Sequence, residues 1–164
     1  MNIIEKKAFA KLGYEESESK ELVSSLNNVL ANYHIHYQKL RNFHWNIVGP
    51  DFFELHEKFE GLYDQVQLNI DEIAERIRVF GKKPMSKLTE YLSHSEIKEV
   101  NEEFSAREMV IEVRKDLEIL LSFYVDTLNI AHKIGDAATA DLMTNYIREA
   151  EKNHWMFHSW LSAK

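Results

Sequence analysis

The chain has 164 residues, of which 45% are hydrophobic and 29% are charged, as expected for one globular domain with a core of its own. It has no cysteine, which excludes disulfides and thiolate metal sites, no apolar run of about 18 residues that would span a membrane, and no signal-peptide pattern at its start. A soluble cytoplasmic protein is therefore expected, and the net charge of −7 argues against general attraction to nucleic acids or anionic membranes.

Residues 1–16 are expected to form an N-terminal tail, and residues 17–164 a single helical domain. The tail holds three lysines and three glutamates. It therefore has no excess of positive charge with which to hold DNA.

The first long helix is predicted from about residue 19 to residue 47, because apolar and aromatic residues recur there at steps of three and four. Ser17 or Ser19 is expected to cap its start. Gly49-Pro50 ends it, because proline lacks a backbone donor and disfavours helix in the residue before it.

A second helix is predicted from about residue 52 to residue 80, and Gly81 followed by two lysines marks its end. The stretch 81–104 is too long for a simple turn. A short helix from Leu88 to Leu92 is expected within it.

The third helix opens with a capping box formed by Ser105 and Glu108, and it runs to about Lys133. Gly135 stops it, and Asp136 is expected to cap the fourth helix. Four amphipathic helices with one long crossover predict an all-α four-helix bundle of the ferritin-like kind.

One face of the second helix carries imidazole and carboxylate groups, which are suitable ligands for a divalent metal such as iron or zinc. Its members are His56, Glu60, Asp64, Asp71 and Glu75.

These residues include two pairs of possible ligands, each one helical turn apart: His56 with Glu60, and Asp71 with Glu75. The pairs start 15 residues apart, which is about 22 Å along a straight helix. Metal–ligand bonds are only about 2 Å long, so one chain is unable to bring both pairs to one metal. Two antiparallel copies related by a two-fold axis would do so, and would create two equivalent sites.

The same region carries several motifs at fixed intervals, among them the 12-residue step from His44 to His56. They are Asn42-Phe43-His44-Trp45-Asn46-Ile47-Val48-Gly49-Pro50, Leu55-His56-Glu57-Lys58-Phe59-Glu60 and Asp71-Glu72-Ile73-Ala74-Glu75-Arg76. These motifs resemble those of the Dps family, the DNA-binding proteins from starved cells, also called mini-ferritins. The resemblance extends from about Leu12 to Trp155.

The resemblance implies a ferritin-like four-helix bundle whose short extra helix lies in the connection between the second and third helices. It also implies a ferroxidase that oxidises Fe(II), preferably with hydrogen peroxide rather than O2, and stores ferric mineral in a hollow homododecamer. Each inter-subunit site would hold two iron ions. Ligands matching the family pattern are His44, His56 and Glu60 from one subunit, and Asp71 and Glu75 from the other. Glu60 departs from the aspartate that is frequent at that position.

Three further residues near these ligands have two interpretations each. Trp45 is either interface packing or an aromatic that intercepts oxidising equivalents, as the resemblance implies. Glu57 and Asp64, which form an acidic patch with Glu60, are either solvated surface or an iron-nucleation surface.

The start of the fourth helix resembles the family segment that lines three-fold pores. Asp136 is expected to act first as a cap, whereas Asp141, with Asn145 one turn later, is the stronger pore candidate. Glu151 and His154 form a Glu-x-x-His motif of the kind found in di-iron bundles, but the chain has no second copy. His154 is therefore expected to be packed or hydrogen-bonded.

Two other functions remain open at this point. The chain is alternatively a nucleoid protein that coats DNA, with iron oxidation secondary. A further possibility is a structural helical assembly, in which the acidic face of the second helix is only solvent-exposed surface.

Overall fold

The structure, a computed structural model, describes residues 14, 16–100 and 103–162. This part of the chain folds into helices without any strand. The helices are α1 (Glu16–Asn46), α2 (Phe52–Val79), α3 (Leu88–His94), α4 (Ala106–Lys133) and α5 (Ala137–Leu161).

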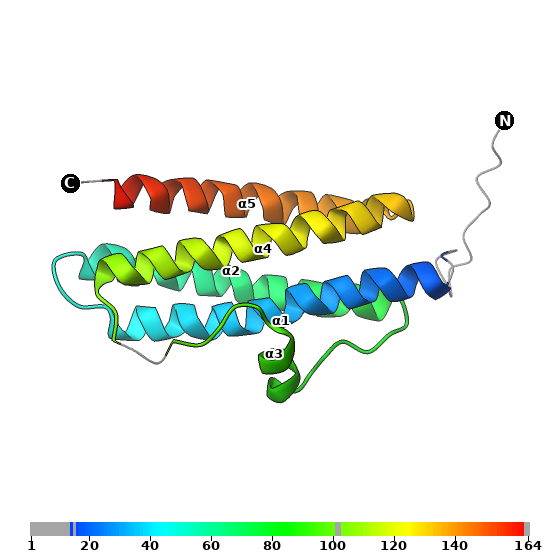
Figure 1. Ribbon diagram of the computed structural model, residues 1–164, viewed down its shortest axis with the longest axis horizontal. Coiled ribbons are helices and arrows are strands. Elements are labelled where there is room, and N and C mark those ends of the chain that lie inside the picture. Colours follow the sequence, from blue (N-terminus) through cyan, green and yellow to red (C-terminus); the bar gives the residue numbers. More distant parts are fainter. Residues whose placement is uncertain (1–13, 15, 101–102, 163–164) are drawn as a thin grey trace.

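The four long helices form a bundle, and the short helix α3 lies against the outside of α1 (Figure 1). The α1–α2 hairpin and the α4–α5 hairpin are the two closely packed pairs, and α1 joins them by packing on α4. On the fourth side the backbones of α2 and α5 lie farther apart, and side-chain hydrogen bonds join the two helices, among them Tyr146 to Glu72 and Lys58 to Asn153, both at 2.8 Å. The predicted all-α bundle with an extra helix in the second connection is confirmed. Over the described residues, no helix is both long and apolar enough to cross a bilayer.

Two predicted helix starts are confirmed by their side-chain hydrogen bonds. The Ser105 hydroxyl accepts from the Glu108 amide at 3.3 Å, and the Glu108 carboxylate accepts from the Ser105 amide at 2.8 Å. The Ser105 hydroxyl also donates to the Glu108 carboxylate at 2.7 Å, and this bond, with the one from the Ser105 amide, lowers the pKa of Glu108. At the start of α5, Asp136 accepts from the Thr139 amide at 3.2 Å. Gly135, at φ +71°, makes the turn between α4 and α5 in a conformation that few other residues adopt.

The predicted cap of the first helix was wrong. Helix α1 starts at Glu16, three residues earlier than expected, so Ser17 and Ser19 lie inside it. The Ser19 hydroxyl donates to the Glu16 carbonyl at 3.0 Å, one turn back. Glu16 and Glu18 in the first turn favour the earlier start, because their negative charges lie near the positive end of the helix dipole and stabilise the helix. The rest of the expected tail, residues 1–13 and 15, lies outside the described residues.

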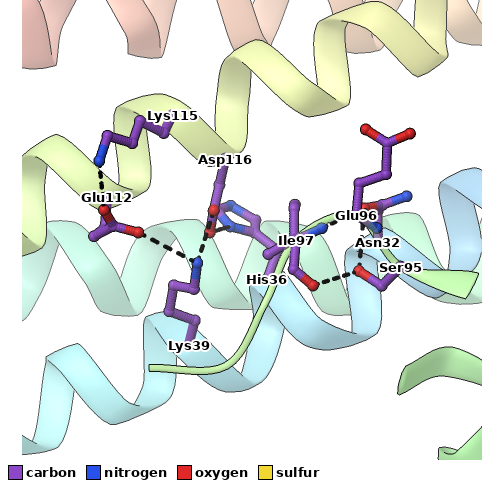
Figure 2. Close-up of polar contacts among 9 residues, drawn as sticks. All are labelled: Asn32, His36, Lys39, Ser95, Glu96, Ile97, Glu112, Lys115 and Asp116. Atoms are coloured by element: carbon purple, nitrogen blue, oxygen red, sulfur yellow. Dashed lines mark hydrogen bonds and ion pairs between the residues drawn. The ribbon is translucent and has the colours of Figure 1, made fainter. Parts of the chain in front are cut away.

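A network of charged side chains is buried between α1 and α4 (Figure 2). The carboxylate of Asp116 accepts from Lys39 at 2.8 Å and lies 2.9 Å from Nδ1 of His36. All three side chains are at most 3% exposed. Glu112, 3.8 Å from Lys39, extends the network to the surface. A buried charge is tolerated only when it is paired, so this network ties α4 to α1.

A second polar contact holds the segment after α3 on the bundle (Figure 2). The side-chain oxygen of Asn32, which is fully buried, accepts from the amides of Glu96 and Ile97, both at 3.0 Å. These bonds satisfy backbone donors that would otherwise be buried without partners. They fix the path of the connection from α3 back toward α4.

Asp116 gives a direct test of the buried network. In Asp116→Asn the Lys39 ammonium remains buried without its counter-charge, and we expect the free energy of unfolding to fall by about 3–5 kcal/mol. Glu112→Gln is the control, because Glu112 is more exposed and more distant, and it should cost less than about 1 kcal/mol. Urea unfolding followed by circular dichroism measures both. Equal losses in the two variants would contradict this account.

Candidate metal centre

The turn between α1 and α2 brings the two expected histidine ligands together. His44 lies in the last turn of α1, and His56 lies near the start of α2. Gly49, at φ +101°, reverses the chain between the two helices. As a result the two imidazole rings stack, with 3.7 Å between centroids and 20° between planes.

Each of these histidines is held by the backbone of the other. Nδ1 of His44 lies 2.8 Å from the carbonyl oxygen of His56, and Nδ1 of His56 lies 2.8 Å from the carbonyl oxygen of His44. A carbonyl oxygen only accepts, so both Nδ1 atoms must carry the proton. In the neutral rings both Nε2 atoms are then free of hydrogen, which is the form that binds a metal.

Glu60 completes a group of three ligands. It follows His56 by one helical turn, and one ligand atom from each of His44, His56 and Glu60 lies within 4.8 Å of the others. His44 is buried, His56 is partly buried and Glu60 is exposed, so the group opens to the surface on its carboxylate side. Two imidazoles with one carboxylate suit a divalent transition metal.

Tyr63, one turn after Glu60, is a neighbour that the sequence analysis missed. Its ring meets His44 edge-on at 5.3 Å, and its hydroxyl donates to Glu60 at 3.5 Å. Desolvation and the charge of Glu60 raise the pKa of Tyr63, so the phenol remains a donor. The spacing His56, Glu60, Tyr63 follows one helix face, and this pattern would have revealed the neighbour.

Asp71 and Glu75 lie elsewhere on α2, as their distance in the sequence requires. Both are exposed, and neither forms a hydrogen bond or ion pair with another residue in the described part of the chain. The structure thus brings together three of the five expected ligands, while the other two remain available at the surface.

The other residues expected near the ligands are also at the surface. Trp45 is 57% exposed and lines a cavity of about 680 Å³ between α1 and the α3 region, with the Arg41 guanidinium 4.7 Å from its ring centroid. Glu57 and Asp64 are exposed on α2. Their exposure fits both interpretations of the acidic patch.

The three candidate pore residues differ in their surroundings. Asp136 is buried and bonded to Arg76 at 2.7 Å as well as to Thr139. Burial raises the pKa of Asp136, but the hydrogen bonds from Thr139 and Arg76 outweigh it, and the pKa lies below the usual value. Asp141 and Asn145 are exposed.

Over the described part of the chain, the isolated Glu-x-x-His motif does not form a group of three ligands. His154 is hydrogen-bonded, as expected, and its partner is Glu118 on α4 at 2.8 Å. Glu151 is exposed on α5.

Comparison with known proteins finds relatives over most of this chain. A family model described as "Ferritin-like domain" matches residues 23–163. A curated relative, DNA protection during starvation protein 2 of Bacillus anthracis, is 40% identical over 88% of this chain and 99% of the relative.

Solved structures show the same likeness. A Dps protein from Vibrio cholerae O1, described as a member of a broad superfamily of ferritin-like diiron-carboxylate proteins, has 42% identity and a TM-score of 0.90, covering 94% of this chain and 99% of that one. Dps from Staphylococcus aureus has 39% identity and a TM-score of 0.86, covering 88% and 97%.

The three-ligand group predicts metal binding that depends on His56. In His56→Ala one of the three ligands is lost, while the His56 carbonyl that orients His44 remains, so we expect the affinity for Co²⁺ to fall by at least about tenfold. His158→Ala, which removes an exposed histidine of α5, is the control and should leave the affinity unchanged. Isothermal titration calorimetry of the metal-free protein measures both. An unchanged affinity in His56→Ala would rule out this group.

Proposed function

The chain belongs to the Dps family of ferritin-like proteins, and on this premise we propose that it is an iron-sequestering mini-ferritin with ferroxidase activity. Fe(II) is the substrate, and it binds as a pair at sites shared between two subunits. Oxidised iron is stored as ferric mineral inside a homododecamer built from two-fold dimers. The observation that carries the proposal is the set of His44, His56 and Glu60, whose ligand atoms converge.

The rigidity of α2 supports a site shared between subunits. Asp71 and Glu75 are fixed about 22 Å along the helix from His56 and Glu60, at ~1.5 Å rise per residue. Their exposure and lack of partners among the described residues support a role as ligands for the facing subunit. In the proposed arrangement, one subunit supplies the imidazoles and Glu60, and the partner supplies two carboxylates.

The proposed reaction needs two electrons and two metal ions held together. Hydrogen peroxide accepts one electron from each of two Fe(II) ions, its O–O bond breaks, and two hydroxide ions and two Fe(III) ions result. Because both electrons are delivered at one site, no hydroxyl radical is released. The protein contributes by orienting its neutral imidazoles before iron arrives, as the reciprocal bonds of His44 and His56 do.

Other acidic residues extend this proposal. Glu57 and Asp64 would nucleate ferric mineral, and Asp141 with Asn145 would line a pore that attracts cations. For Asp136, its bond to Arg76 supports the capping role over the pore role. Trp45 would lie beside the shared site and react with stray oxidising equivalents.

Replacing one carboxylate tests the site. Asp71→Asn should slow oxidation of Fe(II) by peroxide at least about tenfold while leaving the helical content unchanged, because the side chain is exposed and unpaired within the described subunit. Asp126→Asn, on the exposed face of α4, makes the same change of charge and should leave the rate unaltered. Stopped-flow absorbance of ferric iron measures both.

Mixed assemblies distinguish a shared site from one within a single chain. When His56→Ala and Asp71→Asn subunits are co-refolded in equal amounts, each hybrid dimer has one intact shared site, so about a quarter of all sites should regain activity. Assemblies of either variant alone should stay slow. If the hybrids were no faster than the single variants, the inter-subunit arrangement would be wrong, whatever the outcome for Asp71→Asn alone.

DNA binding is the second candidate, because several relatives are named for DNA protection. The net charge of −7 opposes it, since DNA binding depends on neutralising phosphates. We expect no retained DNA in a gel-shift assay at physiological salt. Stable retardation there, lost as salt rises, would instead favour the DNA-coating function.

A further inference from the structure

The side of the bundle formed by α2 and α5 contains a cavity of about 640 Å³. It reaches inward to residues of α1 and α4, which form its floor. It shares no residue with the group of His44, His56 and Glu60, because it lies on another face of α2. This volume is in the range of small-molecule sites in proteins.

The floor of the cavity holds an unused hydrogen-bond donor. The hydroxyl of Tyr33 accepts from Tyr124 at 2.7 Å and from Asn69 at 3.1 Å, which occupies both of its lone pairs. Its own proton has no acceptor among the described residues, although the side chain is only 2% exposed. Burial raises the pKa of Tyr33, so the hydroxyl keeps that proton.

An unused acceptor lies one helical turn away on α1. His36 is 1% exposed and lines the same cavity. Its Nδ1 is bonded to Asp116, as Figure 2 shows, so in the neutral ring Nε2 carries a lone pair. That nitrogen makes no hydrogen bond within the described part of the chain. A donor and an acceptor left over in one buried place are complementary to a hydroxyl group, which both accepts and donates.

An exposed glycine of α2, Gly61, lies at the mouth of the cavity. Gly61 lies in the middle of α2, where glycine destabilises a helix by about 1 kcal/mol relative to alanine. A Cβ built at this position meets nothing within 4 Å, so packing does not require glycine there. Gly61 lines the cavity, and a larger side chain would project into it.

We propose that this cavity binds a small hydroxylated aromatic molecule of the phenol class. Its hydroxyl would accept from Tyr33 and donate to Nε2 of His36. Its ring would lie among the apolar and aromatic side chains of the walls, which suit a planar apolar body. These walls include Leu62, Val66, Leu120, Phe157 and Trp160.

Three probes of similar size test the chemistry on the metal-free assembly: phenol, benzene and cyclohexanol. Met156 lines the cavity, so its ¹³C-labelled methyl resonance reports binding locally, and Met85 serves as a distant reference. We expect phenol to shift Met156 in a saturable way. Benzene lacks the hydroxyl and cyclohexanol lacks the planar ring, and each should bind about tenfold more weakly.

Two substitutions at one residue give a matched control. Gly61→Phe should fill the mouth and abolish the phenol-dependent shift, whereas Gly61→Ala should keep it and raise the unfolding temperature. Tyr33→Phe should weaken phenol binding, because one of its two hydrogen bonds is lost, and should leave benzene binding unchanged. If that variant fails to fold, the Gly61 pair still decides the location of the site.

The proposal is overturned by any of three results. They are an unshifted Met156 resonance in the presence of phenol, binding of benzene or cyclohexanol as tight as that of phenol, and binding of phenol to Gly61→Phe as tight as to the parent chain. The first result would mean that ordered water alone satisfies Tyr33 and His36. Since no iron is added, none of these outcomes depends on the ferroxidase assays.

Discussion

Both halves of the proposed iron site have ligands on α2, and the rigidity of that helix keeps them apart. A straight helix allows its side chains to reach only about one turn to either side, whereas metal ligands must converge to about 2 Å from an ion. The group of His44, His56 and Glu60 satisfies this limit because a second helix, α1, folds back at Gly49. Among the residues that the structure describes, Asp71 and Glu75 have no such neighbour. The proposed function therefore depends on assembly, and a folded monomer would hold half of each site.

Helix α1 carries most of the polar groups that organise the subunit. It supplies His44 to the ligand group, Lys39 and His36 to the buried ion network, and Asn32 to the segment after α3. The apolar residues around these groups supply most of the burial, but they do not define orientation. The polar contacts do, because each buried donor or acceptor is stable only in an arrangement that pairs it.

Much of this architecture was accessible from the sequence. Periodicity located the four long helices, and Ser105 and Asp136 marked two of their starts correctly. Helix α1 was misjudged because serine is favourable at a cap yet tolerated within a first turn, so Ser19 left its role undecided. For the site, the 12-residue step from His44 to His56 predicted neighbours, but nothing in the spacing predicted that each ring would be held by the other's carbonyl. The pairing of His36 with Asp116 could not be predicted from the sequence. The two residues are 80 positions apart, and their contact depends on how α1 and α4 are rotated relative to each other.

The interface between α1 and α4 helps to make the fold unique. Three sets of buried polar contacts cross it: Asp116 with Lys39 and His36, Tyr124 with Tyr33, and Thr127 with Ser25. If one hairpin slid along the other by a single turn, about 5.4 Å, all three would break together. Leucine and valine packing tolerates such slippage far better than an unpaired carboxylate does. The interface between α1 and α4 therefore fixes the register of the two hairpins. It allows one alignment of them and disfavours the near-native packings of a molten globule.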